Sequence, residues 1–204
     1  MTHLEDGACV GDVDVPGNAT RYAELVLTKP DTVDALVNSV VADALSSGDM
    51  VILTSVLQPT ADELRLYAGP GLVDDQGFFD FTGEFAYETR ATFDPSGFSS
   101  EPFTWAIAGL TDQPIVILDT VISEGELDTD SGVRLIKGGR LTGVLTPENA
   151  MAVTLTVDLD LYTALTGLGV EEDYDRDGDG TNESWEAIAR FRTVPVWSFP
   201  ALAE

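Results

Sequence analysis

Apolar side chains recur at helical spacing in one early segment of the chain. In residues 31–47, Val33, Val37 and Val41 follow one another every four residues. Asp31 stands before them as a residue that favours a helix N-terminus. The pattern predicts one amphipathic helix that packs an apolar face against a core.

Most of the remaining pattern predicts β-strands. Apolar and polar residues alternate most clearly over residues 78–92, where Phe79, Phe81, Phe85 and Tyr87 share one face. An apolar run in 114–122 is typical of a strand at the centre of a sheet. The predicted strands cover residues 50–57, 63–67, 78–92, 114–122, 133–136, 140–145 and 187–194.

Two regions depend on turn and cap residues. Lys137-Gly138-Gly139 lies between two of the predicted strands and indicates a hairpin turn. Thr146 and Pro147 are typical of a helix start, and a second helix is predicted from there. The β-branched residues from Val153 to Val157 leave a strand as the alternative to that helix.

These elements predict the fold class. No repeat and no clear linker divides the chain, so residues 1–204 are expected to form a single domain. We expect an α+β fold: a mainly antiparallel β-sheet or sandwich with two helices.

The charge of the chain limits its partners. It has 36 acidic and 10 basic residues and a formal net charge of −26. Such a protein repels phosphate backbones, so we expect no nucleic-acid partner and no anionic membrane surface. No apolar run approaches the roughly 18 residues needed to cross a bilayer, so it is not expected to be transmembrane. Cations are the expected small partners.

Few residues are suited to catalysis. His3 is the single histidine and Cys9 the single cysteine, so a zinc site built on these types is excluded by number. A polysaccharide hydrolase needs only two carboxylates, for which Glu84 and Asp119 are the candidates. Aromatic residues around Trp105 either contact a glycan or protein partner or begin a core strand.

The strongest chemical signal lies near the C-terminus. Residues 173–186 read Asp-Tyr-Asp-Arg-Asp-Gly-Asp-Gly-Thr-Asn-Glu-Ser-Trp-Glu. Calcium binds six to eight oxygen ligands at about 2.3–2.6 Å, and a short loop must wrap around the ion to supply them. Counting from position 175, the predicted metal ligands are Asp175, Asp177, Asp179, the carbonyl of Thr181, Glu183 and Glu186.

The register of this loop follows from its last position. Starting at Asp175 places Gly180 at the sixth position, where the chain must turn sharply, and Glu186 at the twelfth as a bidentate ligand. Starting at Asp173 instead places Ser184 last and loses that ligand. We therefore predict a calcium loop over residues 175–186, within the single domain.

These twelve residues resemble the calcium loop of the EF-hand family. The flanking segments do not favour the two helices of an EF-hand, and no second loop is present. The loop is therefore more similar to the single calcium loops of dockerin modules and thrombospondin type 3 repeats. The order of helix, Gly-Gly-Arg-Leu-Thr-Gly segment (138–143) and acidic loop also resembles uncharacterised secreted or lipid-anchored proteins of myxobacteria.

The sequence thus predicts a calcium-stabilised binding or structural module. The resemblance implies an extracellular, periplasmic or cell-surface location, and a protein or glycan partner in addition to the calcium ion. The alternative is a carboxylate-dependent hydrolase that acts on polysaccharide. A stabilising ion is favoured over a sensing one, because an unpaired loop has no pair of helices to open.

Overall fold

The structure, a computed structural model, describes residues 19–29, 34–57, 63–75, 77–82, 87–94, 97–128 and 135–196. The helices are α1 (Asp34–Ser47), α2 (Pro147–Met151) and α3 (Leu161–Gly167). The strands are β1 (Ala19–Lys29), β2 (Ile52–Leu57), β3 (Glu63–Val73), β4 (Phe79–Phe81), β5 (Tyr87–Asp94), β6 (Gly97–Ser100), β7 (Phe103–Ile107), β8 (Ile115–Asp128), β9 (Leu135–Leu145), β10 (Thr154–Thr156), β11 (Leu159–Asp160) and β12 (Trp185–Val196). Among these residues, no helix is both long and apolar enough to span a bilayer.

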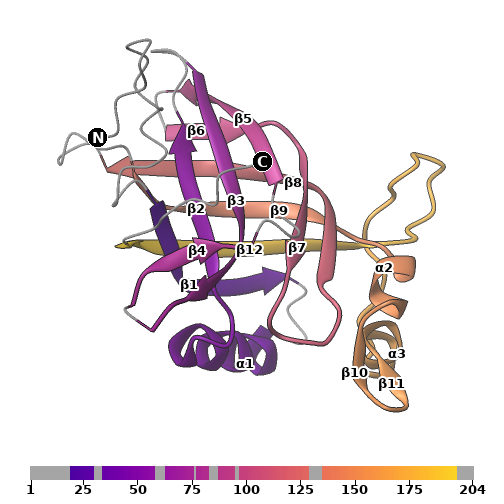
Figure 1. Cartoon of the computed structure of the whole chain (residues 1–204). Coiled ribbons are helices and arrows are strands. Elements are labelled where there is room, and N and C mark those ends of the chain that lie inside the picture. Colours follow the sequence, from indigo (N-terminus) through magenta and orange to yellow (C-terminus); the bar gives the residue numbers. More distant parts are fainter. Residues whose placement is uncertain are drawn as a thin grey trace, which may run out of the picture.

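Eight antiparallel strands close into a barrel (Figure 1). Around the barrel their order is β1, β2, β3, β5, β6, β8, β9 and β12, and β12 pairs with β1 to close it. Strand β7 continues the course of β6 along the same edge of β8. Strand β4 adds to the free part of β3, and β10 pairs with β11 in a separate two-stranded ribbon.

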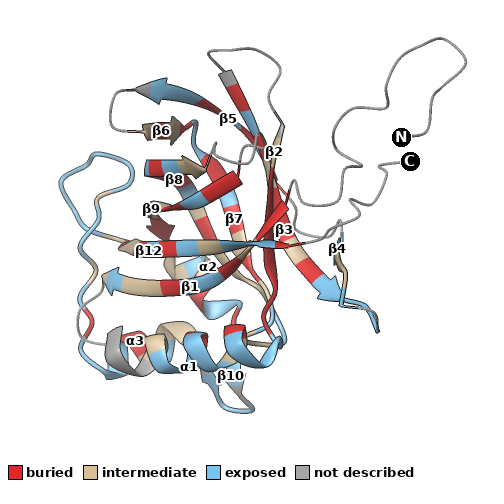
Figure 2. Ribbon diagram, turned by 90° about the vertical axis from the view of Figure 1, so that its left-hand side faces the viewer, coloured by how far each residue is buried: buried red, intermediate tan, exposed pale blue. Residues whose placement is uncertain are grey.

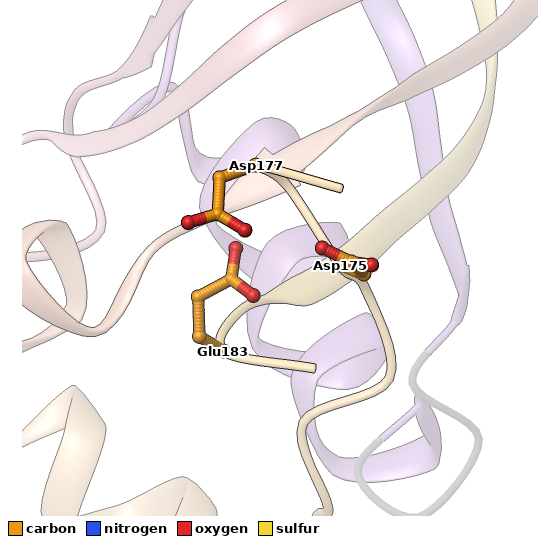
Figure 3. A group of neighbouring side chains, drawn as sticks. All are labelled: Asp175, Asp177 and Glu183. Carbon is orange, nitrogen blue, oxygen red and sulfur yellow. The ribbon is translucent and has the colours of Figure 1, made fainter. Parts of the chain in front are cut away.

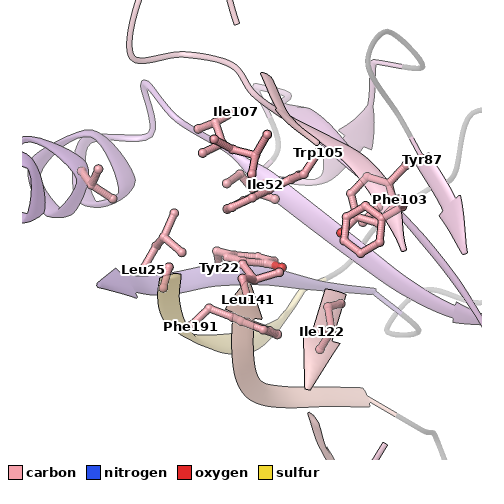
Figure 4. Close-up of a cluster of buried hydrophobic side chains, with 14 of the residues drawn as sticks. Tyr22, Leu25, Ile52, Tyr87, Phe103, Trp105, Ile107, Ile122, Leu141 and Phe191 are labelled. Atoms are coloured by element: carbon pink, nitrogen blue, oxygen red, sulfur yellow. The ribbon is translucent and has the colours of Figure 1, made fainter. Parts of the chain in front are cut away.

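Apolar and aromatic side chains fill the barrel (Figure 4). Tyr22 stacks on Phe191 with ring centroids 4.8 Å apart, and Tyr87 stacks on Phe103 at 4.0 Å. Side chains alternate between the two faces of a strand, so every second residue of each strand reaches this interior. Aromatic pairs of this kind contribute about 0.5–1.5 kcal/mol beyond the area they bury.

A smaller apolar cluster lies on the outer face of β2 and β3. Leu53 is fully buried there although its neighbours in the strand face the interior. Phe81 of β4 covers it, and Tyr67 packs edge-on against Phe81 at 5.0 Å. The segment predicted as one strand over 78–92 thus contributes β4 to this outer cluster and β5 to the barrel, and residues 83–86 lie outside the described residues.

Helix α1 lies across one end of the barrel, with α3 at the same end (Figures 1 and 2). Val41 and Leu45 are its buried face, as the helical spacing predicts. The Asn38 side chain accepts a hydrogen bond from the Leu27 N–H and donates one to the Leu27 carbonyl. The β1–β12 register shifts at Leu27, so Asn38 satisfies backbone groups that the sheet does not pair there.

The predicted α+β fold class is wrong. The described chain is mostly β, with a closed barrel of eight strands and three short helices in place of a sheet or sandwich with two helices. Alternation within a strand identifies an inner and an outer face, and barrels and sandwiches share that pattern. The closing pair, β1 with β12, joins segments about 170 residues apart and is not visible in any local pattern.

Two local predictions are also corrected. Residues 135–145 form one continuous strand, so Lys137-Gly138-Gly139 is not a hairpin turn. The helix predicted from Thr146 does begin there, with the Thr146 hydroxyl accepting a hydrogen bond from the Asn149 N–H, but it ends at Met151. The β-branched segment that follows forms β10, which is the alternative that its composition left open.

Candidate metal centre

The acidic loop connects α3 to β12, and short backbone contacts close its base. Tyr174 and Ser184 form an antiparallel bridge, in which the Tyr174 N–H donates to the Ser184 carbonyl at 3.0 Å. The reciprocal bond, from the Ser184 N–H to the Tyr174 carbonyl, measures 3.2 Å. The residues between them must therefore turn back within a short span.

Trp185 fixes the base of the loop to the core. Its side chain is only 1% exposed, and its Nε1–H donates to the carbonyl of Val170 at 3.3 Å. The ring packs edge-on against Tyr162 of α3 with centroids 5.8 Å apart. One indole thus joins the segment entering the loop, the segment leaving it and the helix before it.

Three of the predicted ligands converge in the loop. Asp175, Asp177 and Glu183 each offer a carboxylate oxygen, and these oxygens lie within 4.8 Å of one another (Figure 3). Two oxygens on opposite sides of a calcium ion, each at about 2.4 Å, are separated by about 4.8 Å. The three carboxylates are therefore close enough together to bind one cation of this size.

Asp175 also shapes the loop backbone. Its two carboxylate oxygens accept hydrogen bonds from the N–H groups of Gly178 and Gly180, at 2.7 and 2.8 Å. Both glycines have positive φ, at 78° and 91°, a backbone conformation that residues other than glycine rarely adopt. The sequence places glycine where the chain turns around Asp175, as a calcium loop requires.

Asp179 and Thr181 are placed beside this group. The Thr181 N–H donates to the Asp179 carboxylate at 2.8 Å, and the Asp179 N–H donates to Asp177 at 3.0 Å. The Asp179 carboxylate thus turns toward its own backbone and is not among the three converging groups. The Asp177 and Asp179 side chains each accept a hydrogen bond from the amide two residues further on, which holds this part of the loop in tight turns.

Glu186 lies with Lys29 instead of with the three converging carboxylates. The Lys29 ammonium is 2.7 Å from Glu186 and 2.8 Å from Asp173. Hydrogen bonds to Asp173 and then to Glu186 raise the pKa of Lys29 above its usual 10.5. The contribution of these ion pairs to stability is therefore present below pH 10.5 and is lost as the pH rises through the higher folded-state pKa.

Lys29 and Asp173 are functional candidates that the sequence analysis did not identify. Lys29 and Glu186 are 157 residues apart, and only the pairing of β1 with β12 brings them together. The Glu186 N–H also donates to Asp173 at 2.9 Å. A lysine that neutralises two carboxylates beside the loop lowers the electrostatic repulsion within it.

A second ion pair attaches the loop to the barrel wall. Arg176 Nε lies 3.4 Å from a carboxylate oxygen of Asp119. Asp119 has a positive φ of 50° and sits where the β8–β9 register shifts, so its side chain points away from the ladder. The loop is thereby held against β1 on one side and β8 on the other.

The candidate residues for a hydrolase do not come together among the described residues. Asp119 is exposed and pairs with Arg176, and Trp105 is 4% exposed within the barrel core. The core-strand interpretation of the aromatic segment is therefore correct at Trp105, which belongs to β7. Glu84, His3 and Cys9 lie outside the described residues.

Comparisons of the sequence and the structure with known proteins gave no match, so the acidic loop and the barrel are the basis for the functional proposal. No protein-family model, no curated protein and no solved structure matches this chain.

Proposed function

We propose that the chain is a calcium-stabilised binding or structural module that acts outside the cytoplasm, with the ion held by residues 175–186. The convergence of Asp175, Asp177 and Glu183 carries this proposal. Carboxylate oxygens are the ligands that calcium prefers, and the aspartates, glycine and glutamate of residues 175–186 follow the spacing of a calcium loop. Single loops of this kind bind calcium with dissociation constants of roughly 10⁻⁴–10⁻³ M, which suits extracellular concentrations.

The role of the ion would be to hold the barrel wall and the loop together. Without a cation, the loop carboxylates repel one another. The two ends of the loop belong to α3 and β12, and its side chains pair with β1 and β8. An ion that neutralises the repulsion therefore stabilises the contacts of the α3–β12 segment with β1 and β8, which are distant from it in sequence. We further propose that the module binds a glycan or protein partner.

Calcium is expected to raise the melting temperature by about 3–10 °C. At 10 mM calcium, dissociation constants of 10⁻⁴–10⁻³ M correspond to about 1.4–2.7 kcal/mol of added stability. For a chain of this size, each kcal/mol shifts the melting temperature by about 2–4 °C. Melting curves in calcium and in chelator, followed by circular dichroism, measure the difference.

Magnesium at the same concentration is the control, because any divalent cation screens a net charge of −26. We expect magnesium to give less than half of the calcium shift. Equal shifts with the two ions would mean that screening, and not a calcium site, stabilises the protein.

Neutralising Asp175 is expected to lower calcium affinity at least tenfold. Asp175→Asn removes a charged ligand and weakens the acceptor for two glycine amides. Glu186→Gln should also weaken binding, if Glu186 leaves Lys29 to complete the ion's coordination. Calorimetric titration of each variant with calcium gives the affinities.

Two matched variants test the register and the charge. Asp173→Asn alters the partner of Lys29 but none of the three converging carboxylates, and it should bind calcium within about threefold of the parent protein. Asp80→Asn removes the same charge at an exposed position of β4, far from the loop in sequence. If Asp173→Asn weakened binding as much as Asp175→Asn, the register starting at Asp175 would be wrong.

A further inference from the structure

An apolar cavity of about 330 Å³ lies at the end of the barrel that α1 and α3 flank. Its walls come from the inner faces of β1, β7, β8, β9 and β12 and from one face of each helix. Trp105, Ile117 and Trp185, all nearly buried, contribute from the strands, and Val41 and Leu165 contribute from the helices. The cavity therefore continues the interior of the barrel toward α1 and α3.

The rim of this cavity exposes large apolar side chains. Val40 of α1 is 52% exposed, Leu168 after α3 is 55% exposed and Leu155 of β10 is 39% exposed. Exposed apolar groups carry a hydration cost of about 25 cal/mol per Å². When they gather around one opening that leads to an apolar interior, they are typical of a ligand-binding site.

The chemistry of the walls defines the ligand. Among the lining residues, Thr111 and Glu186 are the polar ones, and the Glu186 carboxylate is already paired with Lys29. The cavity thus offers no free positive charge, and the net charge of −26 disfavours an anion near its rim. Its volume is about twice that of an engineered 150 Å³ cavity that takes benzene.

We propose that this cavity binds one uncharged, apolar small molecule, such as a long-chain alcohol or a hydrocarbon of similar volume. Burial of the ligand's apolar surface and of the exposed rim drives the binding. Of the lining residues only Glu186 is also a predicted calcium ligand, and its carboxylate lies with Lys29 and not with the three converging carboxylates. Failure of calcium binding would therefore leave it standing, and its own failure would leave the calcium loop untouched.

Fluorescence of the two lining tryptophans provides the test. N-phenyl-1-naphthylamine, an uncharged apolar dye, is titrated into the full chain with excitation of tryptophan. Energy transfer from Trp105 and Trp185 should quench their emission and raise that of the dye, with saturation at one dye per chain. Dodecanol should displace the dye at least tenfold more effectively than dodecanoate, which has the same chain length and a carboxylate.

Variants that fill the cavity decide whether the dye binds there. Ala164→Phe places a ring into the cavity from α3 and should lower dye affinity at least tenfold without lowering the melting temperature. Thr163→Phe, on the exposed side of the same helix, is the matched control and should bind as the parent protein does. Should Ala164→Phe not fold, Ala187→Leu, from β12, fills the same space.

Three results would overturn the proposal. The first is the absence of saturable dye binding. The second is unchanged dye affinity in a folded cavity-filling variant. The third is displacement by dodecanoate as effective as displacement by dodecanol, which would mean that the site accepts anions.

Discussion

Replacing Trp185 with alanine is expected to destabilise the protein by about 3–5 kcal/mol, the range for large aromatic residues removed from a core. The indole is 1% exposed, packs on Tyr162 and donates to the Val170 carbonyl. The substitution leaves a cavity at the junction of α3, the acidic loop and β12. Chemical denaturation in the presence of chelator measures the loss without a contribution from calcium.

Trp185→Phe separates packing from hydrogen bonding. It keeps most of the aromatic volume and loses the bond to Val170, so its cost should be about 1–2 kcal/mol. A loss below about 1 kcal/mol in Trp185→Ala itself would show that the indole does not join the loop to the core.

Raising the pH above 10 is expected to unfold the protein steeply. Burial raises the pKa of Tyr22 and Tyr87 well above the usual value of 10. The unfolded chain releases these protons near pH 10 while the folded chain retains them, so stability falls as pH rises through this window. Each tyrosine contributes a fall of about 1.4 kcal/mol per pH unit. Because the unfolded side chains are only half ionised at pH 10, the two together give about 2 kcal/mol between pH 10 and pH 11.

The double variant Tyr22→Phe, Tyr87→Phe isolates this effect. Neither hydroxyl has a hydrogen-bond partner of good geometry among the described residues, although that of Tyr22 lies beside those of Thr54 and Tyr87. Removing both should therefore change stability by no more than about 1 kcal/mol at pH 7. Urea denaturation at pH 7 and pH 11 compares the proteins. Parallel losses in parent and variant at pH 11 would assign the alkaline unfolding to other groups.

Several elements were predictable, because periodicity reports which face of an element is buried. Helix α1 and strands β2 and β12 lie within three residues of the predicted bounds, and β8 extends six residues past its predicted end. Strand β1 was not predicted. Strand β9 was predicted as two strands joined by a turn, because glycines occur in its middle. A Cβ at Gly138 would lie 2.6 Å from the Phe191 carbonyl oxygen, and one at Gly139 would lie 3.1 Å from the Phe191 ring. Those glycines allow close approach of β12, and the same residue type signals a turn in a sequence.

The acidic loop was predictable for a related reason. Its turns depend on residues within a few positions of one another, such as Asp175 with Gly178 and Gly180. The partners that reach it from the barrel were not predictable, because Lys29 and Asp119 approach only through strand pairing. The placement of Glu186 with Lys29 is a consequence of that tertiary arrangement.

The eight barrel strands pair in chain order and form a closed ring of neighbours. Seven of its eight pairings join strands that follow one another in the barrel's chain order, and the eighth joins the first to the last. At that last pairing Ala19 faces Val196, so the two ends of the barrel segment are neighbours in space. A chain joined there and cut at any other connection would keep the same set of neighbouring strands. The seam between β1 and β12 is thus one of eight places where the ring of strands can be open, and the connection between β9 and β12 differs from the others because it carries α3 and the acidic loop.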